Sequence, residues 1–131
     1  MGGGMGLSQG AALRVVTERT KLAMPETRIG LFPDVGGGYF LSRLPGHLGE
    51  YLALTGHVLK GGEAVAARLA DGSVQAAQLP AIWQHLADTA WPSGIAAQHW
   101  AASQFIAGGA DQTRARGQID HSFGLPTLRD I

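Results

Sequence analysis

The sequence of 131 residues contains no cysteine, few charged residues and no net charge. Without cysteine, the chain has no disulfide framework, no thiolate zinc site and no cysteine nucleophile. Ten basic residues balance ten acidic ones, so the positive charge typical of nucleic-acid-binding proteins is missing. Charged residues make up only 15% of the chain and hydrophobic residues 45%, which excludes a disordered charged tail. No apolar run reaches the roughly 18 residues that a membrane span needs.

Glycine, in contrast, is abundant: the chain has 20 glycines, most of them in residues 1–62. Two runs are triplets, Gly2–Gly4 and Gly36–Gly38. The glycines follow no three-residue period, which excludes a collagen-like chain. A glycine triplet at residue 2 is typical of the middle of a fold, and residues 125–131 end as a new apolar pattern begins. We therefore expect the chain to be an internal fragment of a larger domain.

The hydrophobic pattern predicts two strands followed by helices. Residues 13–17 and 21–24 are short apolar segments typical of strands, and residues 27–32 are expected to be a loop or a short strand. Helices are expected over residues 5–12, 35–44, 46–55, 62–71, 79–86 and 93–106, with Gly56, Gly72 and Gly108-Gly109 as stops and Ser93 as an N-cap. Two short strands cannot cover so many helices, so the pattern indicates an α/β or α+β fold whose other strands lie elsewhere.

The first glycine triplet has two interpretations. Consecutive glycines at the start of a helix expose backbone N–H groups, and the helix dipole favours negative charge there, as in an oxyanion hole. A tight turn or close helix packing explains the glycines equally well. The spacing matches neither G-x-G-x-x-G nor a P-loop, so these routes to nucleotide binding are not indicated.

Ser8 is a candidate nucleophile, because residues 6–10 match the G-x-S-x-G pattern of a nucleophile elbow. That elbow needs an apolar strand directly before it, and here Met5 and the glycine triplet precede it. Three fixed positions also arise readily by chance in a glycine-rich segment. A hydrolase that uses Ser8 is therefore kept only as an alternative.

Two carboxylates form a second candidate site. Glu26 and Asp34 each follow a proline, and the apolar residues 29–32 lie between them. A carboxylate in apolar surroundings can acquire a raised pKa and act as a base, an acid or a nucleophile. On the residues alone, a surface charge at Glu26 and a helix N-cap at Asp34 are the plainer interpretations.

The histidines and tryptophans do not indicate a further functional site. The five histidines show no H-E-x-x-H or other short ligand spacing, so we expect surface or packing roles and no metal site. The three tryptophans, Trp83, Trp91 and Trp100, occupy helical or turn positions and are expected in the core.

Taken together, four sequence blocks resemble the crotonase (enoyl-CoA hydratase/isomerase) superfamily. They are MGGGMGLS at residues 1–8, RVVTE at 14–18, AMPET at 23–27 and IGLFPDVGGGY at 29–39. The likeness continues through Leu54-Thr55-Gly56 and more loosely to about residue 75. It implies an α/β fold with a partial crotonase-like ββα-spiral core. Residues 1–75 would be the C-terminal part of that core, and residues 76–131 a helical segment that starts the following region.

The resemblance also implies roles for three residues. The acyl-CoA carbonyl would lie between two backbone N–H groups, one from Gly3 and the other from a segment that family members carry before this chain begins. Glu26 matches the catalytic carboxylate, and Asp34 matches a second acid found in the hydrolase branch. Hydratases carry a second catalytic glutamate where this chain has Gly6, and small residues where it has Asp34. These departures favour thioester hydrolysis over hydration.

The function implied is hydrolysis of a short 3-hydroxyacyl-CoA thioester, 3-hydroxyisobutyryl-CoA, to 3-hydroxyisobutyrate and CoA in valine breakdown. Glu26 would act either as a nucleophile or as a general base. No metal or redox cofactor is expected, and CoA counts as part of the substrate. The acyl-CoA substrate is the expected binding partner. No nucleic-acid or membrane partner is expected, and a homo-oligomer is a further possibility. The resemblance implies a mitochondrial location for eukaryotic family members and a cytoplasmic location if this protein is bacterial. A hydratase or isomerase, or an inactive truncated fragment, are the alternatives.

Overall fold

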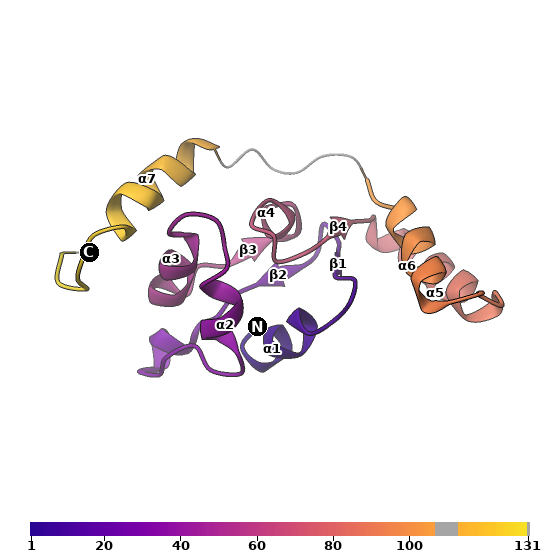
Figure 1. The fold of residues 1–131 in the computed structure, drawn as a ribbon, viewed down its shortest axis with the longest axis horizontal. Coiled ribbons are helices and arrows are strands. Elements are labelled where there is room, and N and C mark those ends of the chain that lie inside the picture. Colours follow the sequence, from indigo (N-terminus) through magenta and orange to yellow (C-terminus); the bar gives the residue numbers. More distant parts are fainter. Residues whose placement is uncertain (107–112, 131) are drawn as a thin grey trace.

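The computed structural model describes residues 1–106 and 113–130 and shows a small mixed core with helices at both ends (Figure 1). Among the described residues, four two-residue strands form two pairs. Strand β1 (Val15–Val16) pairs in parallel with β4 (Gly72–Ser73), and β2 (Lys21–Leu22) pairs antiparallel with β3 (Leu59–Lys60). The helices are α1 (Gly3–Gln9), α2 (Gly37–Leu41), α3 (Leu48–Thr55), α4 (Gly61–Ala66), α5 (Leu79–Asp88), α6 (Gly94–Ser103) and α7 (Thr113–Phe123). Single 3-10 turns cover Glu26–Ile29 and Ala76–Gln78.

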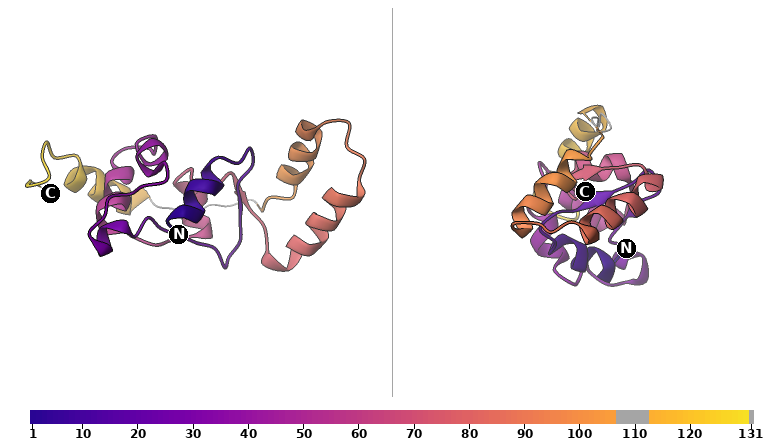
Figure 2. Two further views of the ribbon diagram at one scale, coloured as in Figure 1. Left: turned by 90° about the horizontal axis from the view of Figure 1, so that it is seen from below. Right: turned by 90° about the vertical axis from the view of Figure 1, so that its right-hand side faces the viewer.

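The helices beyond the core pack in two separate places. Helices α5 and α6 form a hairpin at one end of the molecule, whereas α7 lies beside α3 at the other end (Figures 1 and 2). The carboxylate of Asp120 on α7 accepts a hydrogen bond from the backbone N–H of His47, at 2.8 Å, at the start of α3. The rings of Tyr51 on α3 and Phe123 on α7 meet edge to face, with centroids 5.2 Å apart.

The main hydrophobic core joins α1 to the segment that carries Glu26. Met5 on α1 is 2% exposed, and Met24, two residues before Glu26, is 1% exposed. Their neighbours in this core are Phe40, Leu41, Leu44, Leu48, Leu52, Leu59, Ala67 and Leu69. Complete burial of such a side chain is worth about 1.5–3 kcal/mol. The core therefore holds α1 and the Glu26 segment in a fixed relation.

An ion pair fastens β1 to the turn before β4. The Arg14 guanidinium donates to both carboxylate oxygens of Asp71, at 2.6 and 3.0 Å, and the Arg14 backbone N–H donates to the same carboxylate at 2.6 Å. A further guanidinium nitrogen donates to Gln9 Oε1 at 2.7 Å, at the end of α1. The hydrogen bonds from Arg14 lower the pKa of the Asp71 carboxyl below its ordinary value.

Replacing Asp71 by asparagine is expected to lower the free energy of unfolding at pH 7 by about 1 kcal/mol, because the pair is partly exposed. The Asp71 pKa is lowered in the folded state, so its stabilisation is present above the unfolded value of about 3.9 and is lost as the pH falls through the folded value. Urea unfolding at pH 7 and pH 3 measures this. The difference between wild type and Asp71→Asn should shrink at pH 3, whereas Asp88→Asn should change little at either pH.

Much of the expected secondary structure is confirmed. The strands expected at residues 13–17 and 21–24 are present in shortened form as β1 and β2. The helix expected over residues 46–55 is α3, and it ends at Gly56, which is left-handed with φ 60°. Ser93 caps α6 as expected, since its hydroxyl accepts a hydrogen bond from the Ala96 N–H at 3.1 Å. The helices expected over 5–12, 35–44 and 79–86 correspond to α1, α2 and α5.

Three expectations about element bounds are wrong or lie outside the described residues. The helix expected over residues 62–71 ends at Ala66, because Arg68 adopts a left-handed φ of 62°, and Gly72 begins strand β4 instead of stopping a helix. Residues 27–32 contain the end of a 3-10 turn where a loop or strand was expected. The helix expected to reach residue 106 and stop at Gly108-Gly109 ends earlier, at Ser103 with Gln104 as its C-cap; the two glycines themselves lie outside the described residues. The division between residues 75 and 76 stays a prediction.

Candidate active site

The N-terminus of α1 is a glycine-lined end that opens onto free space. Gly2 is the N-cap, with a left-handed φ of 51°, and its N–H donates to the Ala23 carbonyl at 3.1 Å. A Cβ placed on Gly3 or Gly4 would meet nothing within 4 Å. The first amides of a helix have no acceptor within the helix, and the helix dipole adds partial positive charge at this end. The Gly3 amide thus belongs to the helix end that suits a developing oxyanion.

The Glu26 carboxylate is buried against this helix end. Glu26 is 8% exposed, and its Oε1 lies 2.9 Å from the position that a Cβ on Gly2 would take. Its Oε2 is buried and accepts no hydrogen bond from the described residues, and the neighbouring Thr27 hydroxyl is likewise buried without a partner. A buried carboxylate oxygen without a donor is costly, and such groups are concentrated at functional sites. The interpretation of Glu26 as a surface charge is therefore wrong.

Asp34 lies on an exposed tight turn. Its carbonyl accepts a hydrogen bond from the Gly37 N–H at 2.6 Å, and the two residues between them are left-handed, with φ 42° at Val35 and φ 87° at Gly36. These features match a type I′ turn. The N-cap of α2 is Gly36, without a side-chain cap, so the interpretation of Asp34 as an N-cap is wrong.

The first turn of α1 brings the Glu26 and Asp34 segments together. Gly2 is the N-cap, and its carbonyl accepts a hydrogen bond from the Gly6 N–H at 3.3 Å. Gly2 lies against the Glu26 carboxylate. A Cβ on Gly6 would collide with the Val35 carbonyl oxygen and approach the Val35 Cβ to 2.8 Å. The structure thus places Gly3, Glu26 and the turn that carries Asp34 around the first two turns of α1.

Ser8 does not form a nucleophile elbow. It lies inside α1, and its hydroxyl donates to the Met5 carbonyl of the same helix at 3.0 Å. Residues 1–5, which precede the G-x-S-x-G match, contain no strand. The strand-to-helix turn that would present a serine hydroxyl to substrate is therefore missing, and the Ser8 alternative loses its geometric basis.

Neither a metal site nor a membrane span is found in the described part of the chain. No three histidine, aspartate or glutamate side chains gather there in an arrangement that would hold a metal ion. None of the helices in residues 1–106 and 113–130 is long and apolar enough to cross a bilayer.

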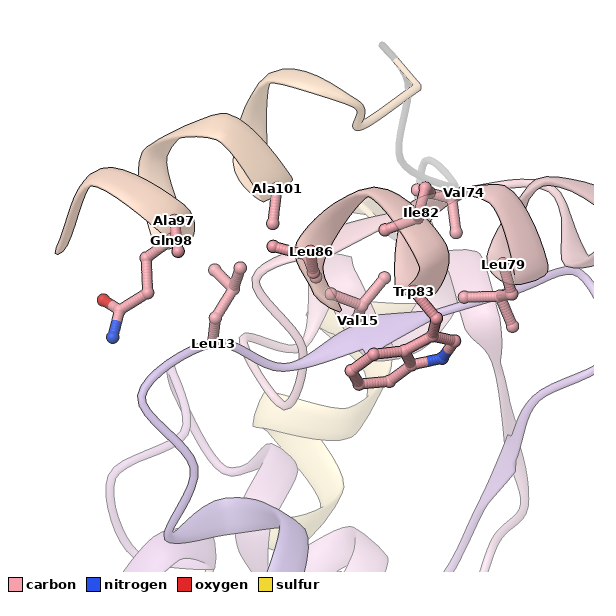
Figure 3. Close-up of a pocket in the computed structure, with 10 residues that line it drawn as sticks. All are labelled: Leu13, Val15, Val74, Leu79, Ile82, Trp83, Leu86, Ala97, Gln98 and Ala101. Carbon is pink, nitrogen blue, oxygen red and sulfur yellow. The ribbon is translucent and has the colours of Figure 1, made fainter. Parts of the chain in front are cut away.

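An apolar hollow of about 260 Å³, whose lining includes neither Glu26 nor Asp34, lies between the α5–α6 hairpin and β1 (Figure 3). Trp83 lines this hollow together with Leu13, Val15 and Leu86, and it is 66% exposed. The expectation that Trp83 belongs to the core is therefore wrong for this chain. Helical spacing alone does not distinguish an apolar face that is covered from one that is not.

With this geometry in hand, comparisons with known proteins show the family. The family model for enoyl-CoA hydratase/isomerase matches residues 1–131, and the chain belongs to this family. A carnitinyl-CoA dehydratase from Mycobacterium thermoresistibile has a similar solved structure, with 37% identity and a TM-score of 0.85. That match covers 99% of this chain and 37% of that protein. The expected partial crotonase-type α/β fold is confirmed.

Two curated relatives differ in their names. The mitochondrial 3-hydroxyisobutyryl-CoA hydrolase of Xenopus tropicalis is 56% identical over 93 residues, which are 71% of this chain. Small ribosomal subunit protein mS47 of Neurospora crassa is 51% identical over 88 residues, which are 67% of this chain. The chain spans 24% and 17% of the length of these relatives. The cytoplasmic location expected for a bacterial protein stays a prediction.

The structure gives two residues roles that the sequence patterns did not assign. Gly2 accommodates the Glu26 carboxylate, and Val35 takes a left-handed backbone conformation against Gly6. The second had a visible signal: Val35 is the only residue with a side chain between Asp34 and Tyr39. A single β-branched residue in a glycine run is conspicuous, but its contact with α1 cannot be derived from the run itself.

Proposed function

We propose that this chain carries the reacting carboxylates of an acyl-CoA thioester hydrolase whose substrate is 3-hydroxyisobutyryl-CoA. The observation that carries the proposal is the buried Oε2 of Glu26, which lacks a donor and belongs to a carboxylate set against the glycine-lined start of α1. The name of the 56% identical relative from Xenopus tropicalis supports the same substrate.

In the proposed reaction the thioester carbonyl oxygen accepts a hydrogen bond from the Gly3 N–H, which stabilises the negative charge that develops on it. Loss of one such donor typically costs about 3 kcal/mol. A Glu26 oxygen or a water deprotonated by Glu26 bonds to the carbonyl carbon, the carbon–sulfur bond breaks, and CoA leaves as a thiolate. If Glu26 itself attacks, water then cleaves the resulting anhydride. Hydrolysis consumes one water and no electron, so it needs no redox cofactor.

The space around Gly6 supports hydrolysis over hydration. In the hydratase pattern a second carboxylate stands at this position, but here any Cβ would collide with the Val35 backbone. An added acid therefore has no room beside Glu26 unless the turn that carries Asp34 moves. In the proposed reaction Asp34 orients the 3-hydroxyl of the substrate or the attacking water.

Release of free CoA from 3-hydroxyisobutyryl-CoA, followed with a thiol reagent, tests the proposal. The assay compares the 131-residue chain with the longest protein that its gene encodes. CoA release by either protein, without hydration of crotonyl-CoA, is the expected result. Hydration of crotonyl-CoA without CoA release would instead identify a hydratase.

Replacing Asp34 by alanine is expected to lower kcat/KM for 3-hydroxyisobutyryl-CoA about tenfold, because a hydrogen bond to a charged group is lost. Isobutyryl-CoA, which lacks the hydroxyl, separates the two roles of Asp34. If Asp34 holds the hydroxyl, the variant cleaves isobutyryl-CoA as fast as wild type does; if it orients the water, both substrates slow down. A hydratase would tolerate the change, and Asp88→Ala is the matched control.

A chain without catalytic activity is the second candidate. The 51% identical relative from Neurospora crassa is named as a protein of the small ribosomal subunit. A similar sequence therefore also occurs in a protein whose name refers to the ribosome and not to an enzyme. Absence of CoA release from both proteins, together with absence of CoA binding in calorimetry, would favour this candidate.

A further inference from the structure

We propose that Val35 is the positioning residue that holds Asp34 in place for hydrolysis. This inference rests on the proposed function, in which Asp34 takes part in thioester cleavage.

Valine is poorly suited to the positive φ that the turn requires at position 35. Val35 and Gly36 are the two central residues of the type I′ turn, with φ of 42° and 87°. This turn needs positive φ at both central positions and strongly prefers Asn-Gly, Asp-Gly or Gly-Gly. A β-branched residue with positive φ is a genuine outlier. The sequence Val-Gly is therefore a strained choice where Asn-Gly or Gly-Gly would form the same turn easily.

Burial of the Val35 side chain does not explain this choice. The residue is 48% exposed, so little of its apolar surface is removed from water. Left-handed residues outside glycine persist only where the surroundings impose them, and they are concentrated at functional sites. A gain in stability is thus a weak explanation for valine at position 35. A requirement of the proposed active site explains it better.

What Val35 supplies is a rigid contact between the Asp34 turn and α1. Its carbonyl oxygen, its Cβ and one methyl group lie against Gly6, as the collision of a Cβ placed there shows. Valine is stiff at χ1, so this contact has one preferred geometry. With glycine at position 35, Asp34 would be followed by four consecutive glycines, the most flexible linkage that a chain can have. Val35 thereby keeps Asp34 in register with Glu26, because Val35 rests on Gly6 and Glu26 on Gly2, and a backbone hydrogen bond links these two glycines.

Three variants test the inference. Val35→Gly removes the Cβ and methyl contacts with Gly6 but keeps the carbonyl, whereas Val35→Thr keeps a β-branched side chain of the same shape. Arg68→Gly is the matched control, because Arg68 is the other non-glycine residue with positive φ in the described part of the chain, with φ 62°, and it lies at the end of α4. Arg68→Gly relieves the same kind of strain outside the proposed site.

The first readout is the carboxyl ¹³C NMR signal of Asp34, assigned with Asp34→Asn. We expect Val35→Gly to move this signal toward its position in the urea-unfolded chain, and Val35→Thr and Arg68→Gly to leave it in place. The second readout is kcat for CoA release, which Val35→Gly should lower about tenfold at unchanged KM, as expected for a misplaced group. Val35→Thr should stay within about twofold of wild type, and Arg68→Gly should equal it.

The outcomes separate this inference from the proposed function. An unchanged Asp34 signal in Val35→Gly overturns the inference, and so does a shifted signal with an unchanged kcat. If wild type releases no CoA, the proposed function fails, and the Asp34 signal alone then decides whether Val35 holds Asp34. A fall in kcat that Arg68→Gly shares would show that the effect is not specific to the Asp34 turn and would also overturn the inference.

Discussion

Replacing Glu26 by glutamine is expected to lower kcat for hydrolysis of 3-hydroxyisobutyryl-CoA by about 10³-fold, with KM nearly unchanged. Glutamine has the same shape as glutamate, but its amide neither attacks a thioester nor accepts a proton from water. The Glu26 carboxylate stands against Gly2 at the start of α1, next to the Gly3 amide that is proposed to bind the carbonyl oxygen. Steady-state release of CoA measures the effect.

The stability of the Glu26→Gln variant is expected to move in the opposite direction. Glu26 Oε2 is buried without a donor among the described residues, so the wild-type carboxylate carries a desolvation cost that a neutral amide reduces. An unfolding midpoint equal to or above that of wild type, together with the loss of kcat, would show that Glu26 serves the reaction and not the fold. Glu18→Gln is the control, since Glu18 accepts a hydrogen bond from the Ala76 N–H at the surface. Retention of wild-type kcat by Glu26→Gln would contradict the mechanism.

Replacing Gly6 by alanine is expected to lower the free energy of unfolding by about 3 kcal/mol. The added methyl group would meet the Val35 backbone carbonyl, which cannot turn away as the end of a flexible side chain can. Either α1 or the turn that carries Asp34 must move, so activity should fall as well. Urea unfolding and CoA release measure the two effects.

Gly4→Ala is the matched control for this prediction. Gly4 lies on the same helix, and a Cβ there meets nothing within 4 Å. Alanine is preferred over glycine within a helix by about 1 kcal/mol, so Gly4→Ala should equal or exceed wild type in stability. Equal unfolding midpoints for Gly4→Ala and Gly6→Ala would contradict the close approach of Val35 to α1.

The sequence predicted the helices α1 to α6 and two of the strands because their signals are local. The periodic apolar residues of α3 and the stop at Gly56 are read directly from adjacent positions. Strands β3 and β4 are two residues long and have no pattern of their own; they exist because β2 and β1 pair with them from far along the chain. Helix α7 was missed for a similar reason: its sequence is mostly polar, and its place beside α3 depends on Asp120 and Phe123.

The candidate site was predicted through a resemblance and not from the residues alone. Glu26 and Asp34 were noticed because each follows a proline, but their spacing gave no reason to prefer chemistry over a surface charge or an N-cap. The burial of Glu26 follows from the core contacts of Met24 and from the glycine at position 2, which are tertiary effects. The strain at Val35 is likewise invisible until the turn is seen to rest on Gly6.

The pairing of β1 with β4 has a consequence for the order in which the protein folds. Arg14 and Asp71 are 57 positions apart, and closing a loop of that length costs about 3.5 kcal/mol of chain entropy in a simple polymer estimate. Contacts between such distant positions slow folding, because the entropy is lost before the contacts form. Glu26, Asp34 and Val35 all lie inside this loop. The contact of Val35 with Gly6 spans only 29 positions, so the β1–β4 pairing is expected to form after it and to close the fold around the two carboxylates.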